Sequence, residues 1–186
     1  MQKRFIILLA AFLFISISGQ AQVLSLDEVI SAPTKESDQI DELLLGKKWE
    51  KYNYEVHSDS GFVKHIWVIK NNYNDLKSYF TYQQYDASAI ENHITYQYSD
   101  RNLYKSFLID LKKKDYKVLT LKKKKSKKKK DKSKGKVEEY YFLSEKNNSL
   151  VVVKDVFMLG FNVFLTSAYN ANSQIGKRIL EEREND

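Results

Sequence analysis

Three histidines, His57, His65 and His93, are the side chains best suited to metal or acid–base chemistry in this sequence. His57 and His65 flank a short polar segment that contains Asp59, and a hairpin there could gather all three side chains around a divalent cation. In one hairpin register, however, the two imidazoles would be too far apart, and no carboxylate follows at a recognisable metal-ligand spacing. We therefore expect ordinary histidines of a sheet, with no bound metal and no cofactor.

Motifs for covalent or phosphate chemistry are missing from the sequence. No serine lies in a G-x-S-x-G elbow, cysteine is absent, and the six glycines form neither a G-x-G-x-x-G motif nor a P-loop. Neighbouring acidic residues such as Glu138 and Glu139 project to different sides of a strand and cannot share a proton. We expect a protein that is not an enzyme, and a hydrolase or metal enzyme without recognisable motifs is the least favoured reading.

Aromatic residues are abundant, with 13 tyrosines and 10 phenylalanines, and they concentrate in segments with the alternating pattern of strands. Because successive side chains of a strand point to opposite faces, and only one face can meet helices, some rings should be exposed. An exposed tyrosine is a good contact residue, since its ring buries a large area at low entropic cost. The alternative is that tyrosine is simply common in half-buried strands. The candidate binding face comprises Tyr79, Tyr82, Tyr85, Tyr96 and Tyr98.

Residues 122–136 contain 11 lysines in 15 positions and lie between two predicted strands. We expect a long hairpin whose lysine-rich tip is kept extended by its own repulsion. Such a tip either stays solvated, or it contacts an anionic envelope surface or an acidic protein. Each lysine near an anionic bilayer contributes about 1 kcal/mol. The predicted anionic-surface contact comprises Lys122, Lys123, Lys124, Lys125, Lys127, Lys128, Lys129, Lys130, Lys132, Lys134 and Lys136.

The lysine run also dominates the net charge. The chain carries +7; without Lys3 and Arg4 it carries +5, and residues 112–136 alone carry +13, which leaves −8 on the rest. The basic character therefore belongs to one segment of an otherwise acidic protein. No arginine or aromatic side chain interrupts the run to read or stack bases, so we expect no specific nucleic-acid partner.

The first 21 residues have the pattern of a cleavable signal peptide. Two basic residues precede an uncharged, mostly apolar run at 5–17, and the small residues Gly19 and Ala21 follow. This run is shorter than the roughly 20 residues of a membrane-spanning helix, and no later run is longer, so the mature chain should contain no transmembrane segment. We expect cleavage after Ala21 and export to the periplasm or the extracellular space. The absence of cysteine excludes a lipid anchor, and the composition is typical of an AT-rich Gram-negative bacterium.

The rest of the chain should form a short helix and linker at 22–36 and a single α+β domain at 37–186. Ser25 with Glu28 fits a capping box, and Asp100 and Ser173 are placed to cap later helices. Aromatic and β-branched runs separated by short polar joints favour antiparallel strands. The predicted helices after the linker are 37–49, 101–113 and 173–184, and the predicted strands are 52–57, 62–70, 76–85, 93–99, 116–124, 136–144, 149–158 and 161–169.

The predicted order of elements is helix, four strands, helix, four strands, helix. Ser78–Tyr82 resembles Ser149–Val153, and Thr95–Tyr98 resembles Thr166–Tyr169, both at an offset of 71 residues. The chain is therefore either a tandem α-β-β-β-β duplication or two meanders that share only a pattern. Both readings predict an antiparallel sheet of about eight strands with helices on one face.

The two repeats would span residues 37–99 and 100–172. This layout is similar to that of secreted β-lactamase-inhibitor-like folds, which repeat a helix-plus-sheet unit and bind proteins on the open face of the sheet. The similarity is one of architecture and carries over no functional residue. We expect an exported, non-catalytic binding domain that contacts a protein or an anionic envelope component. The alternative is a periplasmic carrier that holds a small apolar ligand between the sheet and its helices.

Overall fold

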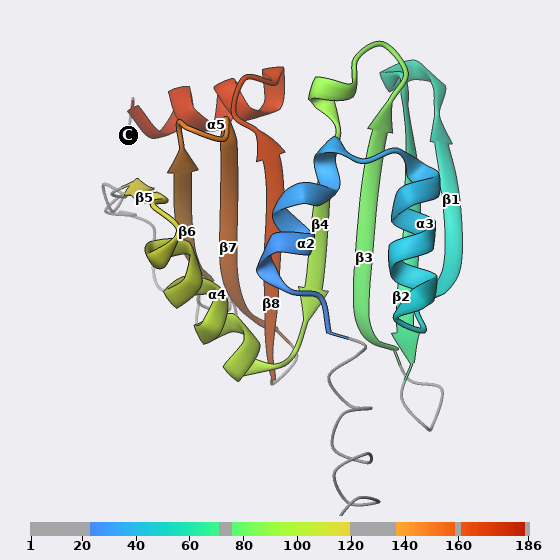
Figure 1. The fold of residues 1–186 in the computed structure, drawn as a ribbon, viewed down its shortest axis with the longest axis horizontal. Helices are drawn as coiled ribbons and strands as arrows, with labels where there is room; N and C mark the ends of the chain where they lie inside the picture. Colours follow the sequence, from blue (N-terminus) through green and yellow to red (C-terminus); the bar gives the residue numbers. More distant parts are fainter. Residues whose placement is uncertain (1–22, 71–75, 120–136, 159–160, 185–186) are drawn as a thin grey trace, which may run out of the picture.

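The computed structural model describes residues 23–70, 76–119, 137–158 and 161–184, which form one antiparallel sheet with helices packed on it (Figure 1). This confirms the α+β class and the eight strands. Among the described residues, no helix is long and apolar enough to cross a membrane. The strands are β1 (Glu50–His57), β2 (Phe62–Lys70), β3 (Leu76–Tyr85), β4 (His93–Tyr98), β5 (Lys117–Leu119), β6 (Val137–Ser144), β7 (Ser149–Met158) and β8 (Phe161–Asn170).

Two meanders meet at the centre of the sheet. The strand order is β1-β2-β3-β4-β8-β7-β6-β5, so each group of four follows the chain and only the β4–β8 pair joins the groups. We call β1–β4 the first half and β5–β8 the second half. Their junction runs from the pair His93–Tyr169 to the pair Tyr98–Phe164. In the turn between β1 and β2, Gly61 has φ 65°, a left-handed conformation that glycine adopts without strain.

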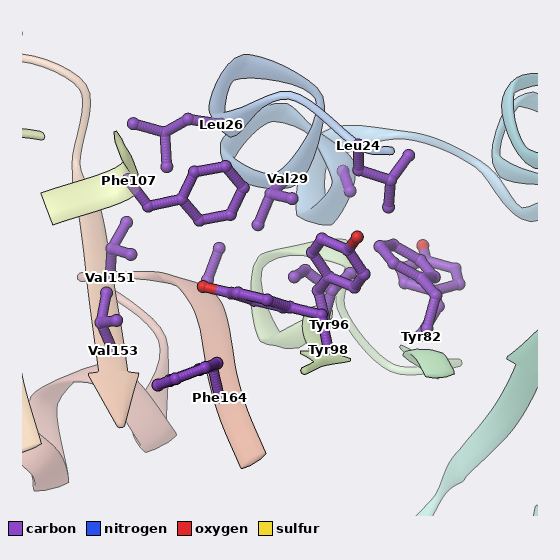
Figure 2. Close-up of a cluster of buried hydrophobic side chains, with 14 of the residues drawn as sticks. Leu24, Leu26, Val29, Tyr82, Tyr96, Tyr98, Phe107, Val151, Val153 and Phe164 are labelled. Atoms are coloured by element: carbon purple, nitrogen blue, oxygen red, sulfur yellow. The ribbon is translucent and has the colours of Figure 1, made fainter. Parts of the chain in front are cut away.

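Three helices cover one face of the sheet, which we call the front face (Figure 1). Their buried side chains, among them Leu26, Val29 and Phe107, pack in one cluster with Val151, Val153 and other strand residues (Figure 2). On several strands the cluster takes alternate residues, such as Tyr96 and Tyr98 on β4, so the residues between them point to the opposite, back face. The front helices are α2 (Leu26–Ser31), α3 (Ser37–Gly46) and α4 (Arg101–Lys113).

The C-terminal helix α5 (Gln174–Glu184) packs on the back face instead. Its residues Ile179 and Leu180 contact a second cluster that contains Leu150, whose neighbour Val151 belongs to the front cluster. Helices therefore contact both faces, and the prediction of helices on one face is wrong for α5. The amphipathic pattern shows that this helix has an apolar side, but it does not show which face of the sheet receives that side.

The predicted short helix near the start of the described chain is present as α2, and the segment around it contributes Leu24 and Ala32 to the core. Leu24 and Val29 are fully buried, and the short 3-10 helix η1 (Ala32–Thr34) continues directly from α2. The predicted capping box is present: Ser25 N donates to Glu28 Oε2 at 2.7 Å, and Glu28 N donates to Ser25 Oγ at 3.3 Å. The predicted domain boundary at residue 37 thus divides a single packing unit.

The two halves share a topology, but some aligned residues face different ways. Phe80 and Val151 both face the front, as the offset of 71 residues requires. Tyr98, however, lies in the front cluster, whereas Tyr169 packs against the back cluster. A shift of one residue reverses every side chain of a strand, so the alignment of Thr95–Tyr98 with Thr166–Tyr169 is not a structural equivalence.

Candidate binding surface

The five tyrosines predicted to form a binding face lie on two different faces. Tyr82, Tyr96 and Tyr98 are at most 2% exposed and face the helices, so the prediction is wrong for these three. Tyr79 and Tyr85 lie three positions before and after Tyr82 on β3, so their side chains point to the back face. Both are half-buried. Sequence alternation shows that neighbouring side chains diverge, but the packing of the helices decides which set is buried.

The buried tyrosines hold the fold together. Tyr82 Oη donates to Lys35 O at 2.7 Å and accepts from Asn92 Nδ2 at 2.9 Å, which ties the segment before α3 to the start of β4. Tyr98 Oη lies 3.0 Å from Thr166 Oγ1 across the junction of the two halves. Burial raises the pKa of Tyr82 to about 12 and also raises the pKa of Tyr98, so both hydroxyls stay protonated at neutral pH.

Five aromatic rings cross the back face in a continuous row, which we call the aromatic row. The ring centroids are 4.5 Å apart for His57 and Phe62, and 5.2 Å apart for Phe62 and Tyr85. The row continues at 6.0 Å from Tyr85 to His93 and at 5.1 Å from His93 to Tyr169. It crosses β1, β2, β3, β4 and β8 in the order in which these strands pair. Aromatic contacts at such distances stabilise the sheet beyond the burial of their area.

Strand register builds the aromatic row. His57 is paired with Phe62, and Phe62 with Tyr85, on adjacent strands of the first half. His93 is paired with Tyr169 across the junction. Only Tyr85 of this row was among the predicted site residues. The sequence supplies the rings, but the pairing of β4 with β8 cannot be read from it, and that pairing completes the row.

Charged and hydroxyl groups accompany the rings on the back face. Lys64 Nζ donates to Glu55 Oε2 at 2.9 Å, and His57 Nε2 lies 3.4 Å from the same oxygen. The hydrogen bond from Lys64 lowers the pKa of the Glu55 carboxyl, which keeps it ionised. Nearby, Thr95 Oγ1 and Ser167 Oγ lie 2.9 Å apart. The surface therefore offers donors and acceptors of several kinds beside its aromatic rings.

Burial of the back face differs between the halves. Beside α5, the side chains of Leu150, Val152 and Tyr141 are at most 4% exposed. Among the residues that the structure describes, the cluster around α5 contains none from β1–β4. Six of the half-buried, back-facing residues of the first half, all on β2 and β3, define what we call the open face: Lys64, Ile66, Tyr79, Thr81, Gln83 and Tyr85.

The histidines do not converge on a common point. His57 stacks on Phe62 on the back face, whereas His65 stacks on Trp67 and Tyr82 on the front face, at 5.7 and 6.1 Å. These opposite directions exclude a joint site with Asp59. Within the described ranges, no group of three potential ligands is arranged to hold a metal ion. Burial lowers the pKa of both His65 and His93, which favours the neutral imidazole at pH 7.

The predicted lysine contact at residues 122–136 lies outside the described residues. The strands on either side of it are neighbours, as the predicted hairpin requires: Lys117 pairs with Leu143, and Leu119 pairs with Tyr141. This pair of strands forms the end of the sheet opposite β1. This pair of flanking strands is therefore separated from the first half by β7 and β8.

Comparisons with protein families, with curated proteins and with solved structures found no match to this chain.

Proposed function

We propose that this protein is an exported, non-catalytic binding domain that contacts a protein partner through its open face. The observation that carries the proposal is the contrast on the back of the sheet. Helix α5 packs on the second half, while the back of the first half presents most of the aromatic row beside ion pairs and hydroxyls. Export is supported by the leader pattern of residues 1–21.

The chemistry of the open face suits a folded protein partner. Tyrosines such as Tyr79 and Tyr85 are enriched at protein interfaces because they combine a rigid apolar ring with a polar tip. Thr81 and Gln83 add hydrogen-bonding groups between the rings. The neighbouring Lys64–Glu55 ion pair would favour a complementary partner over others, since charges act chiefly on specificity and association rate.

We also propose that the lysine segment adds attraction to an anionic partner or to the anionic envelope surface. The support is the distribution of charge, with +13 on residues 112–136 and −8 on the remainder of the mature chain. Replacement of the lysines of residues 122–130 by serine should weaken binding of the mature protein to anionic liposomes at low salt. Unchanged binding would contradict this part of the proposal while leaving the open face untouched.

A tandem duplication is a further part of the proposal. It is supported by topology, because α3 precedes the meander β1–β4 and α4 precedes the meander β5–β8, with the last strands of the two meanders side by side. The reversed facing of Tyr98 and Tyr169 requires a one-residue slip in one copy after the duplication. On this reading, the second half later acquired α5 and the first half kept an open back.

The alternative role of carrier for an apolar ligand gains no support from the core. Leu44, Phe80 and Leu111 are each fully buried in the one cluster between the sheet and the front helices. Side chains thus occupy the layer in which such a ligand would lie, and we favour the binding domain.

Site-specific crosslinking tests the open face. A photoreactive amino acid is placed at Thr81 or Gln83 in the mature protein, which is then irradiated in its own envelope fraction. The matched control carries the same amino acid at Ile109, which is 52% exposed on the front helix α4. We expect one crosslinked partner from positions 81 and 83 and none from 109. An identical product from all three positions, or none from 81 and 83, would contradict the proposal.

A further inference from the structure

A second site, independent of the open face, lies where the two halves meet near the end of the junction. The structure has a cleft there of about 440 Å³, within the usual range of small-molecule sites. Its lining comes from α2 and η1, from the 3-10 helix η3 (Ala89–Glu91), from the β6–β7 turn and from the end of β8. Both halves thus contribute to it.

The walls of the cleft are held by hydrogen bonds within the fold. Asn148 has φ 47°, and its carbonyl accepts from Ala171 N at 2.7 Å, which fixes the β6–β7 turn against the end of β8. Thr34 Oγ1 donates to Ser31 O at 2.8 Å in η1. Asn92 N donates to Ala89 O at 3.1 Å in η3. A cleft formed in advance spares a ligand much of the entropic cost of ordering its site.

The lining combines apolar groups with amides and hydroxyls. Ile30, Pro33 and Ile90 provide the apolar part, and the Ile90 side chain is 40% exposed there. The polar part includes the side chains of Asn148 and Ser149. None of the eleven lining residues is an aspartate, glutamate, lysine, arginine or histidine.

This combination selects for a neutral ligand that has both hydroxyl groups and an apolar face. An ion would lose its hydration in the cleft and gain no opposite charge. A hydrocarbon chain would cover polar side chains such as Asn148 without forming hydrogen bonds with them, which is unfavourable. An amide side chain offers one acceptor and two donors, which matches neighbouring hydroxyls. We propose that the cleft binds a neutral saccharide unit, with its C–H face on Ile90 and its hydroxyls on the amides.

The test is a titration of the ¹⁵N-labelled mature protein with two probes, N-acetylglucosamine and maltose, followed by NMR. We expect at least one probe to shift the amide signals of Ser31, Thr34, Ala89 and Asn148, and to leave those of the open face unchanged. Ile90→Asp should weaken this binding about tenfold, because it replaces an apolar contact with a charge. Ile109→Asp, at an exposed site on α4 outside the cleft, should bind like the unmodified protein.

Asn148→Gly provides a second variant, since glycine keeps the left-handed backbone and removes only the amide. It should also weaken binding about tenfold, the effect of a hydrogen bond worth about 1.4 kcal/mol. No shifts with either saccharide would overturn the proposal. So would larger shifts of the same signals with trialanine, because the cleft would then be a peptide site.

Discussion

The two halves of this sheet have the same strand order, but among the residues that the structure describes a helix packs only on the back of the second half. Beneath α5, the back-facing side chains include Leu143, Leu150 and Val152. The corresponding surface of the first half is mixed: it carries Lys64 and Gln83 as well as the aliphatic Ile66. Aliphatic side chains gain most from being covered, whereas lysine and glutamine do not. The comparison shows that the back surface covered by α5 has more aliphatic side chains than the open face.

The helix on the second half is fixed in part by the first half. The carboxylate of Glu91, at the end of η3, accepts from Gln174 N with distances of 2.9 and 3.0 Å to its two oxygens. Ser173 Oγ accepts from Gly176 N at 2.9 Å and caps the same helix, as the sequence predicted. Negative charge at a helix start is favourable, so Glu91 stabilises α5 from across the junction.

The largest expected effect is a difference in stability between two truncation variants, one on the back of each half. Leu150→Ala removes a fully buried side chain beside α5 and should lower the free energy of unfolding by about 3 kcal/mol. Ile66→Ala on the open face should cost about 1 kcal/mol, because that side chain is already half in water. Urea unfolding of both variants measures the difference. Equal losses would mean that the two back faces are equally buried.

The second prediction concerns a variant that displaces α5. A Cβ atom on Gly176 would lie 2.3 Å from Asn170 O and 3.0 Å from Ala171 Cα, so Gly176→Ala must move the helix. We expect a loss of about 2 kcal/mol and faster hydrogen exchange throughout α5. Gly46→Ala is the matched control, since nothing lies within 4 Å of its Cβ position in α3, and it should be neutral or slightly stabilising. Equal behaviour of the two variants would contradict the close packing of α5.

The third prediction concerns the pH dependence of stability. It compares a histidine on the back face with one on the front face. Burial lowers the pKa of His93 on the back and of His65 on the front below the ordinary value of 6.5. The unfolded chain therefore takes up these protons first. The stabilisation that the two neutral imidazoles contribute is fully present above about pH 6.5. Below that pH it falls by at most about 1.4 kcal/mol per pH unit for each histidine, until the pH reaches the pKa of that histidine in the folded state.

Urea midpoints measured between about pH 7.5 and about pH 5 test this, since the lower limit stays above the ordinary carboxyl range. His93→Gln should flatten the profile more than His65→Gln, because the His93 side chain is the more deeply buried of the two. A profile that stays flat in the unmodified protein, or that rises towards acid, would contradict the burial of both imidazoles.

Most of the fold could be predicted from local pattern. Alternation and short polar joints located the strands, and Ser25, Asp100 and Ser173 cap helices as expected. The position of α5 could not be predicted, because an amphipathic helix fits either face of a sheet. The contribution of Leu24 to the core was missed for a related reason: one apolar residue outside a helix has no period to reveal it.

The candidate surface was harder to predict than the fold. Tyr82 and Tyr85 have the same side-chain type and lie three residues apart, yet one is buried and the other faces the back. Only the placement of the helices distinguishes them. The aromatic row depends further on the β4–β8 pairing, which joins Thr95 to Ser167 over a separation of 72 residues. Pairing at this range is set by the whole fold and leaves no local pattern.

The junction between β4 and β8 also determines when the sheet can be completed. Every other strand pair joins strands that follow one another along the chain, so each meander can form soon after its residues emerge. The junction must wait for β8 (Phe161–Asn170), which follows all the other strands of the sheet along the chain. A chain that crosses a membrane N-terminus first would thus leave one edge of β4 unpaired until the last strand arrives. That edge is the place where premature pairing between chains would begin.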